Sequence, residues 1–440
     1  MNKLSSRFWL ALVIFSLVGQ VAWVVENMYL NVFIYEMFNA SATDISLMVA
    51  LSAVTATLTT VIIGALSDKL GKRKIFICGG YIAWGISILA FAFVRVDFLS
   101  STFPFVSATA IGISLTIILD CIMTFFGSTA NDACFNAWLT DSVDDGRRGK
   151  AEGVNAMMPL IALLAVFGSF MAFDLSIPDS WTTIFIIIGS VVSIIGIIGL
   201  FLIEDAPINA EGNNKYFANI IYGFRPKVIK ENKDLYLSLI AFALFGIAIQ
   251  IFMPYLIIYY TDTLKLDNYV LILAPAVILA SALTVFYGRL YDKFGFARSI
   301  FPSLTILGVG FIIMYFFTSV PLVFIGSLMV MCGYLTGTAV FGARIRDNTP
   351  KNKAGMFQGL RIVGQVLIPG VIGPFIGSAV LSGAEQILNG DGTYSFLPNT
   401  NIFLASFVAL IVVVAYLLIL ELIKNKKTSP NKNIYSIDEE

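Results

Sequence analysis

Long apolar runs separated by short polar turns are the dominant pattern of this 440-residue chain. A helix needs about 20 apolar residues, at about 1.5 Å each, to cross a bilayer. Twelve runs are long enough, and their uniform apolarity favours helices over the alternating strands of a barrel. The predicted spans lie near residues 8–38, 45–66, 75–95, 105–138, 151–173, 181–203, 235–261, 269–290, 298–318, 321–343, 355–381 and 400–422.

Composition agrees with an all-α membrane protein. Hydrophobic residues make up 58% of the chain and charged residues only 13%, against about 25% charged in an average soluble domain. The net charge is zero, so we expect no nucleic-acid partner. The four cysteines lie in apolar runs, as small core residues do. The absence of histidine excludes a histidine proton relay, a histidine metal site and a Ser-His triad.

Basic residues predict the orientation. If the N-terminus is cytoplasmic, the inward turns hold nearly all Lys and Arg, and the outward turns hold only Arg95 and Lys265. We therefore expect a multi-pass protein of the cell membrane with both termini in the cytoplasm. The first apolar run lacks a cleavage pattern, which argues against a removable signal peptide.

The chain divides into two halves around a polar segment. Residues 204–234 predict a cytoplasmic linker between a six-helix bundle at 1–203 and a second at 235–422. The Lys-rich tail, 423–440, predicts a disordered cytoplasmic end.

Two repeated turns indicate that the halves are duplicates. The turn GALSDKLGKRK at 64–74 returns as GRLYDKFGFAR at 288–298, 224 residues later. A second turn places Asp141, Gly149 and Gly153 at the spacing of Asp347, Gly355 and Gly359. Since both signatures fall in matching places, we expect two pseudo-symmetric six-helix bundles.

The first turn resembles the signature of the major facilitator superfamily, G-x-x-x-D-[RK]-x-G-[RK]-[RK], and the resemblance covers residues 8–422. The second copy departs from it at Phe296 and Ala297. The turn with Asp141 and Arg148 also resembles that of sugar-type carriers, including the glycoside–pentoside–hexuronide group.

The resemblance implies alternating access, in which two bundles rock about a midplane site. Asp68 and Asp292 would then face helix N-termini of the opposite half and latch the cytoplasmic side. Contacts of Arg148 with Asp141 and of Lys353 with Asp347 would match on the other turns. Alternatively, these charges only fix topology. The candidate gating residues are Gly64, Asp68, Gly71, Arg73, Asp141, Arg148, Asp292, Arg298 and Asp347.

Ionisable residues inside a span are costly, so they are functional candidates. Glu26 lies in the first span and Asp120 in the fourth, and the resemblance implies that these spans line the central cavity. Because burial disfavours a charged carboxylate, either can carry a proton during transport. The alternative is that both are structural.

Further polar residues lie nearer the cytoplasmic side. Asp132 and Asn136 are four residues apart, as are Arg361 and Gln365, so each pair shares a helix face. Arg361 needs a carboxylate, and Asp132 or Asp120 is the expected partner. Trp23 either stacks on a sugar ring or faces lipid. The candidate binding residues are Glu26, Asn27, Asn31, Asp120, Asp132, Asn136, Arg361, Gln365 and Gln250.

These features predict a secondary transporter that imports a small polar solute, such as a sugar or glycoside, in symport with a proton. Sodium coupling is the variant, and the alternative function is a drug or metabolite exporter. The fifth span lacks the G-P motif of drug–proton antiporters, which counts against that exporter. We expect no cofactor, no metal and no ATP site, and a monomer. An enzyme acting on lipid or a sensor is disfavoured, because the sequence offers no nucleophile–base pair and no large soluble domain.

Overall fold

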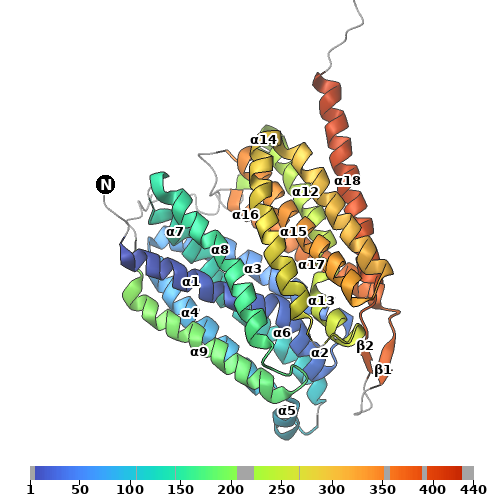
Figure 1. The fold of residues 1–440 in the computed structure, drawn as a ribbon. Coiled ribbons are helices and arrows are strands. Elements are labelled where there is room, and N and C mark those ends of the chain that lie inside the picture. Colours follow the sequence, from blue (N-terminus) through green and yellow to red (C-terminus); the bar gives the residue numbers. More distant parts are fainter. Residues whose placement is uncertain are drawn as a thin grey trace, which may run out of the picture.

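The computed structural model describes residues 5–105, 107–143, 145–205, 222–266, 268–350, 357–388 and 394–428, without the side chains of 145–149, Gln358 and 424–428. Helices dominate (Figure 1). The N-terminal half comprises α1 Ser6–Val24, η1 Val25–Tyr29, α2 Leu30–Phe38, α3 Ala42–Leu70, α4 Lys74–Ala90, η2 Phe91–Phe93, α5 Val96–Thr102, α6 Ala108–Gly127, η3 Ser128–Phe135, α7 Asn136–Asp141, α8 Asp145–Phe170 and α9 Pro178–Leu202.

The C-terminal half follows two short elements, η4 Tyr222–Phe224 and α11 Pro226–Glu231. It comprises α12 Lys233–Gln250, η5 Met253–Tyr255, α13 Leu256–Ile258, η6 Tyr259–Thr263, α14 Val270–Phe316, α15 Val320–Asn348, α16 Gln358–Ile362, η8 Val363–Leu367, α17 Ile368–Leu381, β1 Gln386–Leu388, β2 Tyr394–Phe396 and α18 Asn401–Thr428.

Eleven helical segments of the described chain are long and apolar enough to cross a membrane. One of them, α14, has 47 residues and turns at Gly295, where φ is +77°. At 1.5 Å per residue such a helix would be about 70 Å long, twice the thickness of a bilayer core, so its two arms are separate spans. The twelve predicted spans and the all-α fold are therefore confirmed.

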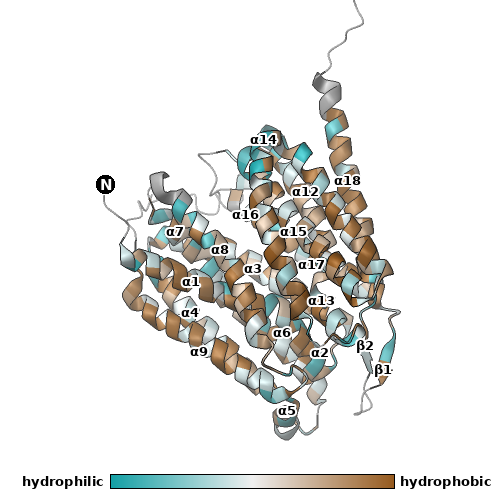
Figure 2. Ribbon diagram, viewed as in Figure 1, coloured by the Kyte–Doolittle hydropathy of each residue, from teal (hydrophilic) through white to brown (hydrophobic). Residues whose placement is uncertain are grey.

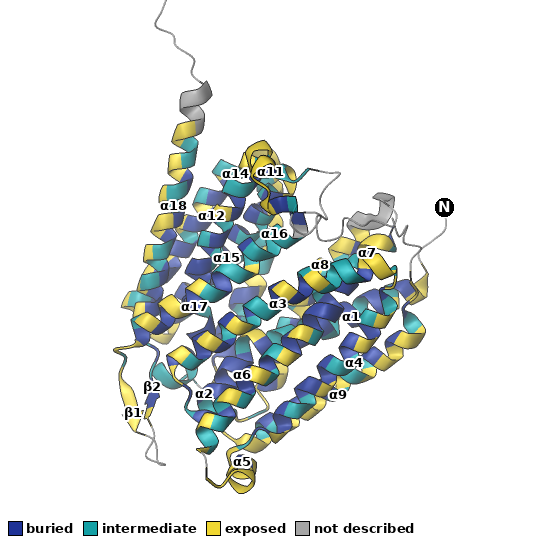
Figure 3. Cartoon of the chain, turned by 180° about the vertical axis from the view of Figure 1, so that it is seen from behind, coloured by how far each residue is buried: buried dark blue, intermediate teal, exposed yellow. Residues whose placement is uncertain are grey.

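The surface of the helices is apolar where a soluble protein would be polar. On α9, the exposed side chains include Ile186, Ile187, Ile194 and Phe201, and Figures 2 and 3 show apolar, exposed stretches along α9 and α18. This is the distribution that a lipid environment requires, because lipid replaces water around the bundle.

Alternate turns lie at two ends of the molecule. We call the end with the turns around residues 71–73, 142–143 and 295 the basic end, and the other, with α5 and the hairpin of β1 and β2, the opposite end (Figure 1). The hairpin is antiparallel, with Ile387 paired to Ser395, and it lies between the predicted spans 355–381 and 400–422.

The predicted linker and tail are described only in part. Residues 206–221 and 429–440 lie outside the described residues, so the linker bounds stay a prediction. At the C-terminus, α18 runs through Thr428, past the predicted end of the span at residue 422. Lysine favours both helix interiors and helix C-termini, which explains why the helix extends into the basic tail.

Candidate functional site

Glu26 lies in the N-terminal half within η1, a π-helical turn that interrupts the first span. Such single turns widen the helix locally and are frequent at functional sites. Only 6% of Glu26 is exposed. Its Oε1 accepts hydrogen bonds from Ser52 Oγ (3.0 Å) and Thr124 Oγ1 (2.7 Å), whereas Oε2 is buried without a partner.

Asp120 completes this cluster. It lies on α6, one helical turn before Thr124, and is 2% exposed. Asp120 lies near both Ser52 and Glu26, and its Oδ1 is buried without a partner. The Ser52 and Thr124 hydroxyls are themselves 2.8 Å apart. We call Glu26, Asp120, Ser52 and Thr124 the carboxyl cluster.

The structure thus brings together the two carboxylates that the sequence singled out, from the first and fourth spans. Sequence reasoning missed Ser52 and Thr124, since hydroxyls are common in membrane helices and usually bond to their own backbone. No ion pair of either carboxylate occurs among the described residues.

A second polar group lies beside the carboxyl cluster. Trp23 Nε1 donates to Asn131 Oδ1 (3.3 Å), and Asn131 Nδ2 donates to Tyr81 Oη (2.8 Å). The Trp23 ring lies against Trp84, with centroids 5.0 Å apart. Trp23 is therefore engaged with the interior of the N-terminal half.

The other predicted binding residues of this half differ in exposure. Asn27 is exposed and donates to Trp23 O, while Asn31 is buried, with its Oδ1 unpartnered. Asp132, in the π-helical η3, accepts from Ser128 (3.1 Å), and the exposed Asn136 donates to the backbone oxygen of Asp132.

In the C-terminal half, Gln250 ends α12 and lies against Gly373 of α17, where a Cβ would be 2.5 Å from Gln250 Cβ. Gln365 lies in the π-helical η8. Arg361 is half-buried on α16, and its Nε is buried without a partner. The expected ion pair of Arg361 with Asp132 or Asp120 is absent from the described residues.

Among the gating candidates, Arg73 organises the basic end of the N-terminal half. Its guanidinium donates to Ser67, Asp68 and Asp141, with 3.1 Å between Nε and the Asp141 carboxylate. Burial lowers the pKa of Arg73, but the carboxylates of Asp68 and Asp141 outweigh it and raise that pKa above its ordinary value. These contacts hold together turns of one half.

Asp205 adds a contact that the sequence did not suggest. Its Oδ1 accepts from the backbone nitrogens of Arg73 (2.8 Å) and Lys74 (2.7 Å), at the start of α4. A carboxylate at a helix N-terminus satisfies unpaired N–H groups and stabilises the helix dipole.

The remaining gating candidates are less connected. Gly71 has φ +63°, matching the positive φ of Gly295 in the second copy of the turn. Gly64 lies near Ala133 of η3. Asp292 and Arg298 are exposed, and Asp347 accepts from Tyr291 Oη. The side chain of Arg148 lies outside the described residues, as does Lys353, so the latch between halves stays a prediction.

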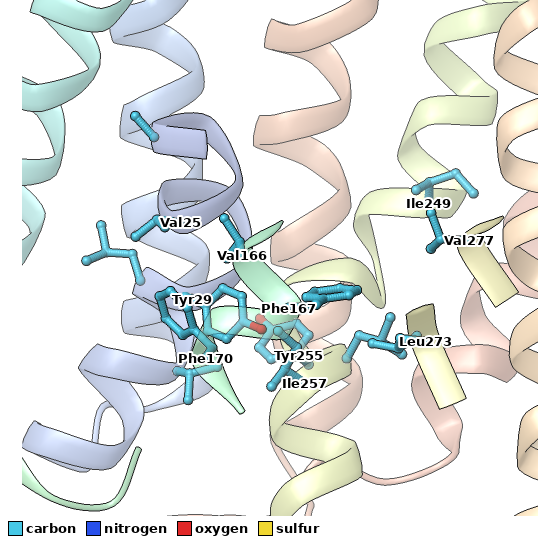
Figure 4. Packing of buried hydrophobic residues seen from close by; sticks show 14 of the residues in the cluster. Val25, Tyr29, Val166, Phe167, Phe170, Ile249, Tyr255, Ile257, Leu273 and Val277 are labelled. Carbon is cyan, nitrogen blue, oxygen red and sulfur yellow. The ribbon is translucent and has the colours of Figure 1, made fainter. Parts of the chain in front are cut away.

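Hydrogen bonds between the two halves gather towards the opposite end. Tyr269 Oη donates to Tyr29 Oη (3.0 Å), and Tyr35 Oη donates to Phe396 O (2.8 Å). Ser46 Oγ donates to Pro374 O (2.7 Å) and lies 2.7 Å from Tyr255 Oη. Figure 4 shows Tyr29, Phe167 and Phe170 of one half beside Tyr255 and Leu273 of the other. These packed aromatic and aliphatic side chains join the two halves.

Twelve apolar spans in two six-helix halves, with carboxylates buried in the bundle, define a multi-pass membrane transport fold. The chain matches the Major Facilitator Superfamily over residues 8–374 and belongs to that family. It is accordingly a membrane transporter and not an enzyme.

Solved structures share the fold at low sequence identity. A mutant form of the nucleoside transporter NupG has a TM-score of 0.73 at 12% identity, over 93% of this chain and 98% of its own. A bacterial homolog of the human lysosomal transporter Spinster scores 0.68 at 14% identity, covering 94% and 97%. The xylose transporter XylE from E. coli scores 0.66 at 13%, covering 94% and 98%. No curated protein sequence matches the chain.

Proposed function

We propose that this protein is a proton-coupled symporter that imports a small polar organic solute of the sugar or glycoside type. Its two halves would expose the site alternately to each side of the membrane. The carboxyl cluster, with Glu26 and Asp120, is the proposed proton site.

The single observation that carries the proposal is the presence of two buried carboxyls, Glu26 and Asp120, in one cluster. Ser52 donates to Glu26, and Glu26 and Asp120 each have a carboxyl oxygen that is buried without a partner. Because two like charges at close range in an apolar bundle repel each other and lose hydration, at least one must be neutralised. Since neither carboxylate forms an ion pair with a described residue, a proton supplies that neutralisation. Its release to one side of the membrane would couple to the motion of the halves.

The solute class rests on weaker support. The turn with Asp141 resembles that of sugar carriers, and one solved structure with this fold is described as a D-xylose-proton symporter. Amide groups at Asn31 and Asn131 and the indole of Trp23 near the carboxyl cluster suit a hydroxylated ring. Asn27, Asp132, Asn136, Gln250, Arg361 and Gln365 are the further proposed contacts.

Uptake into proteoliposomes under an imposed inward pH gradient tests the coupling. With a panel of labelled sugars and glycosides, we expect pH-driven uptake by the wild type. Glu26→Gln and Asp120→Asn should each abolish the response to the gradient, while Glu152→Gln, an exposed acid on α8, leaves it intact. Coupling by proton is refuted if both cluster variants behave as the wild type, or if a sodium gradient alone drives uptake. Proton-driven export in the same vesicles would favour the exporter.

A further inference from the structure

Arg361 is a half-buried cation on α16, a helix that contacts α3 of the N-terminal half. It lies on α16, two residues after Gly359, where a Cβ would be 3.3 Å from a methyl carbon of Val61 on α3. Arg361 is half-buried as a whole, and its Nε atom is fully buried. Residues two apart in a helix point to opposite faces, so Arg361 lies on the helix that meets α3 but on its other face.

Among the described residues, no acid balances this cation. Arg361 takes part in no hydrogen bond or ion pair with any described residue. The charged group that acts on it is a second cation, Arg346 of α15. The nearest preceding acid in the described sequence, Asp347, accepts from Tyr291, and Asp132 accepts from Ser128; neither pairs with Arg361.

A half-buried, unpaired guanidinium beside another cation costs free energy that a bound anion would recover. The guanidinium presents a fork of N–H donors that matches a carboxylate or a phosphate in a bidentate fashion. Neutral hydroxyls would leave its charge uncompensated. The missing partner of Arg361 is thus an oxyanion.

We propose that the transported solute carries an oxyanion group, a carboxylate or a phosphate, which binds Arg361. This inference rests on the proposed function, because it names the chemistry of the solute that the transporter moves. A sugar acid or a sugar phosphate combines the anion for Arg361 with hydroxyls for the polar groups of the N-terminal half.

Thermal stabilisation of the purified full-length protein by matched ligands tests the proposal. Glucose, glucuronate and glucose 6-phosphate differ only at C6, where they carry a hydroxymethyl, a carboxylate or a phosphate. Gluconate, succinate and acetate extend the panel of anions. We expect at least one anion to raise the melting temperature of the wild type while glucose does not, and the responding group distinguishes carboxylate from phosphate.

Three variants complete the experiment. Arg361→Gln should weaken the stabilising anion at least tenfold, and Arg361→Lys, which keeps the charge without the fork, should fall between it and the wild type. Arg344→Gln removes a basic-end cation that instead lies over the Phe296 ring, and should leave binding unchanged.

The proposal is overturned if glucose stabilises the protein as well as glucuronate or glucose 6-phosphate does. It is also overturned if Arg361→Gln keeps full anion binding, or if no anion of the panel stabilises the wild type. These binding data do not depend on coupling. Anion binding with no pH-driven uptake would contradict only the proposed proton symport. pH-driven uptake of neutral sugars would contradict only the proposal that the solute carries an oxyanion group.

Discussion

The carboxylate side chains of this transporter lie in two different environments. Glu26 and Asp120 are buried without a cationic partner among the described residues, whereas Asp68 and Asp141 are held by the guanidinium of Arg73. The same functional group is therefore the proposed proton carrier in one place and an ion-pair partner in the other. The difference is the neighbouring cation, which stabilises the ionised form.

At the opposite end, Arg95 ties α5 to α9 and makes folding stability dependent on pH. Its guanidinium donates to both carboxylate oxygens of Asp97 (3.0 and 3.2 Å) and to Asp179 (2.5 Å). The hydrogen bond from Arg95 lowers the pKa of Asp97 below its ordinary value of 3.8. A depressed pKa contributes stability above the unfolded value, and that contribution is lost as pH falls through the folded value.

We therefore expect Asp97→Asn to lower the free energy of unfolding near pH 7, by less than about 1 kcal/mol because the pair is exposed. The gap between variant and wild type should close as the pH falls below the ordinary value of 3.8. Denaturant unfolding in detergent across pH 3–7 measures it. Arg95→Gln should remove the same pH dependence, and a gap that persists at pH 3 would contradict this account.

Among elements, α4 and α9 pack closely. A Cβ on Gly85 would lie 2.2 Å from Ser193 Oγ and 2.4 Å from Gly189 O. Small residues at such crossings let backbones approach, which is the main source of helix association in lipid. The sequence contains 35 glycines, and only the packing shows which of them matter.

Gly85→Ala should destabilise the N-terminal half by about 1–3 kcal/mol, because the backbones must separate to admit the methyl group. Gly79 on the same helix has nothing within 4 Å of its ideal Cβ. Gly79→Ala is therefore the matched control, and it should be neutral or stabilising, since alanine favours helices. Thermal unfolding of both variants measures this difference. Equal melting temperatures of Gly85→Ala and Gly79→Ala would contradict the close packing of α4 against α9.

For the molecule as a whole, the hydrogen bonds between halves predict which end opens with difficulty. The hydroxyls of Ser46 and Tyr255 lie within hydrogen-bond distance of each other and of the backbone oxygens of Pro374 and Ala42, and the two hydroxyl protons can make two of these bonds at a time. Each bond contributes about 0.5–1.5 kcal/mol net. They stabilise the closed arrangement of the opposite end, and the proposed alternating access requires that they break.

The double variant Ser46→Ala/Tyr255→Phe should raise the population opened at that end roughly tenfold, since about 1.4 kcal/mol corresponds to a factor of ten. Spin labels at the exposed Phe103 and Leu388, one in each half, report the separation by pulsed electron resonance, with the native cysteines replaced. Thr305→Val removes a hydroxyl that bonds only within α14 and should change nothing. An unchanged distance distribution in the double variant would show that these bonds do not hold the halves together.

The amino-acid sequence by itself determined the membrane class, the twelve spans, the duplication and the family. These follow from local quantities: the length of apolar runs, the placement of Lys and Arg, and glycines at turns such as Gly71 and Gly295, where φ is positive. It also singled out Glu26 and Asp120, because a carboxylate inside an apolar run is conspicuous without any structure.

Only the tertiary structure decided which side chains contact the candidate functional residues. Ser52 and Thr124 around the carboxylates, Asp205 at the start of α4 and the unpaired state of Arg361 all depend on contacts between distant segments. Hydropathy sets which residues enter the bilayer but not which helix faces meet, since lipid and a neighbouring helix are equally apolar. Close packing of small residues and a few directional hydrogen bonds make that choice.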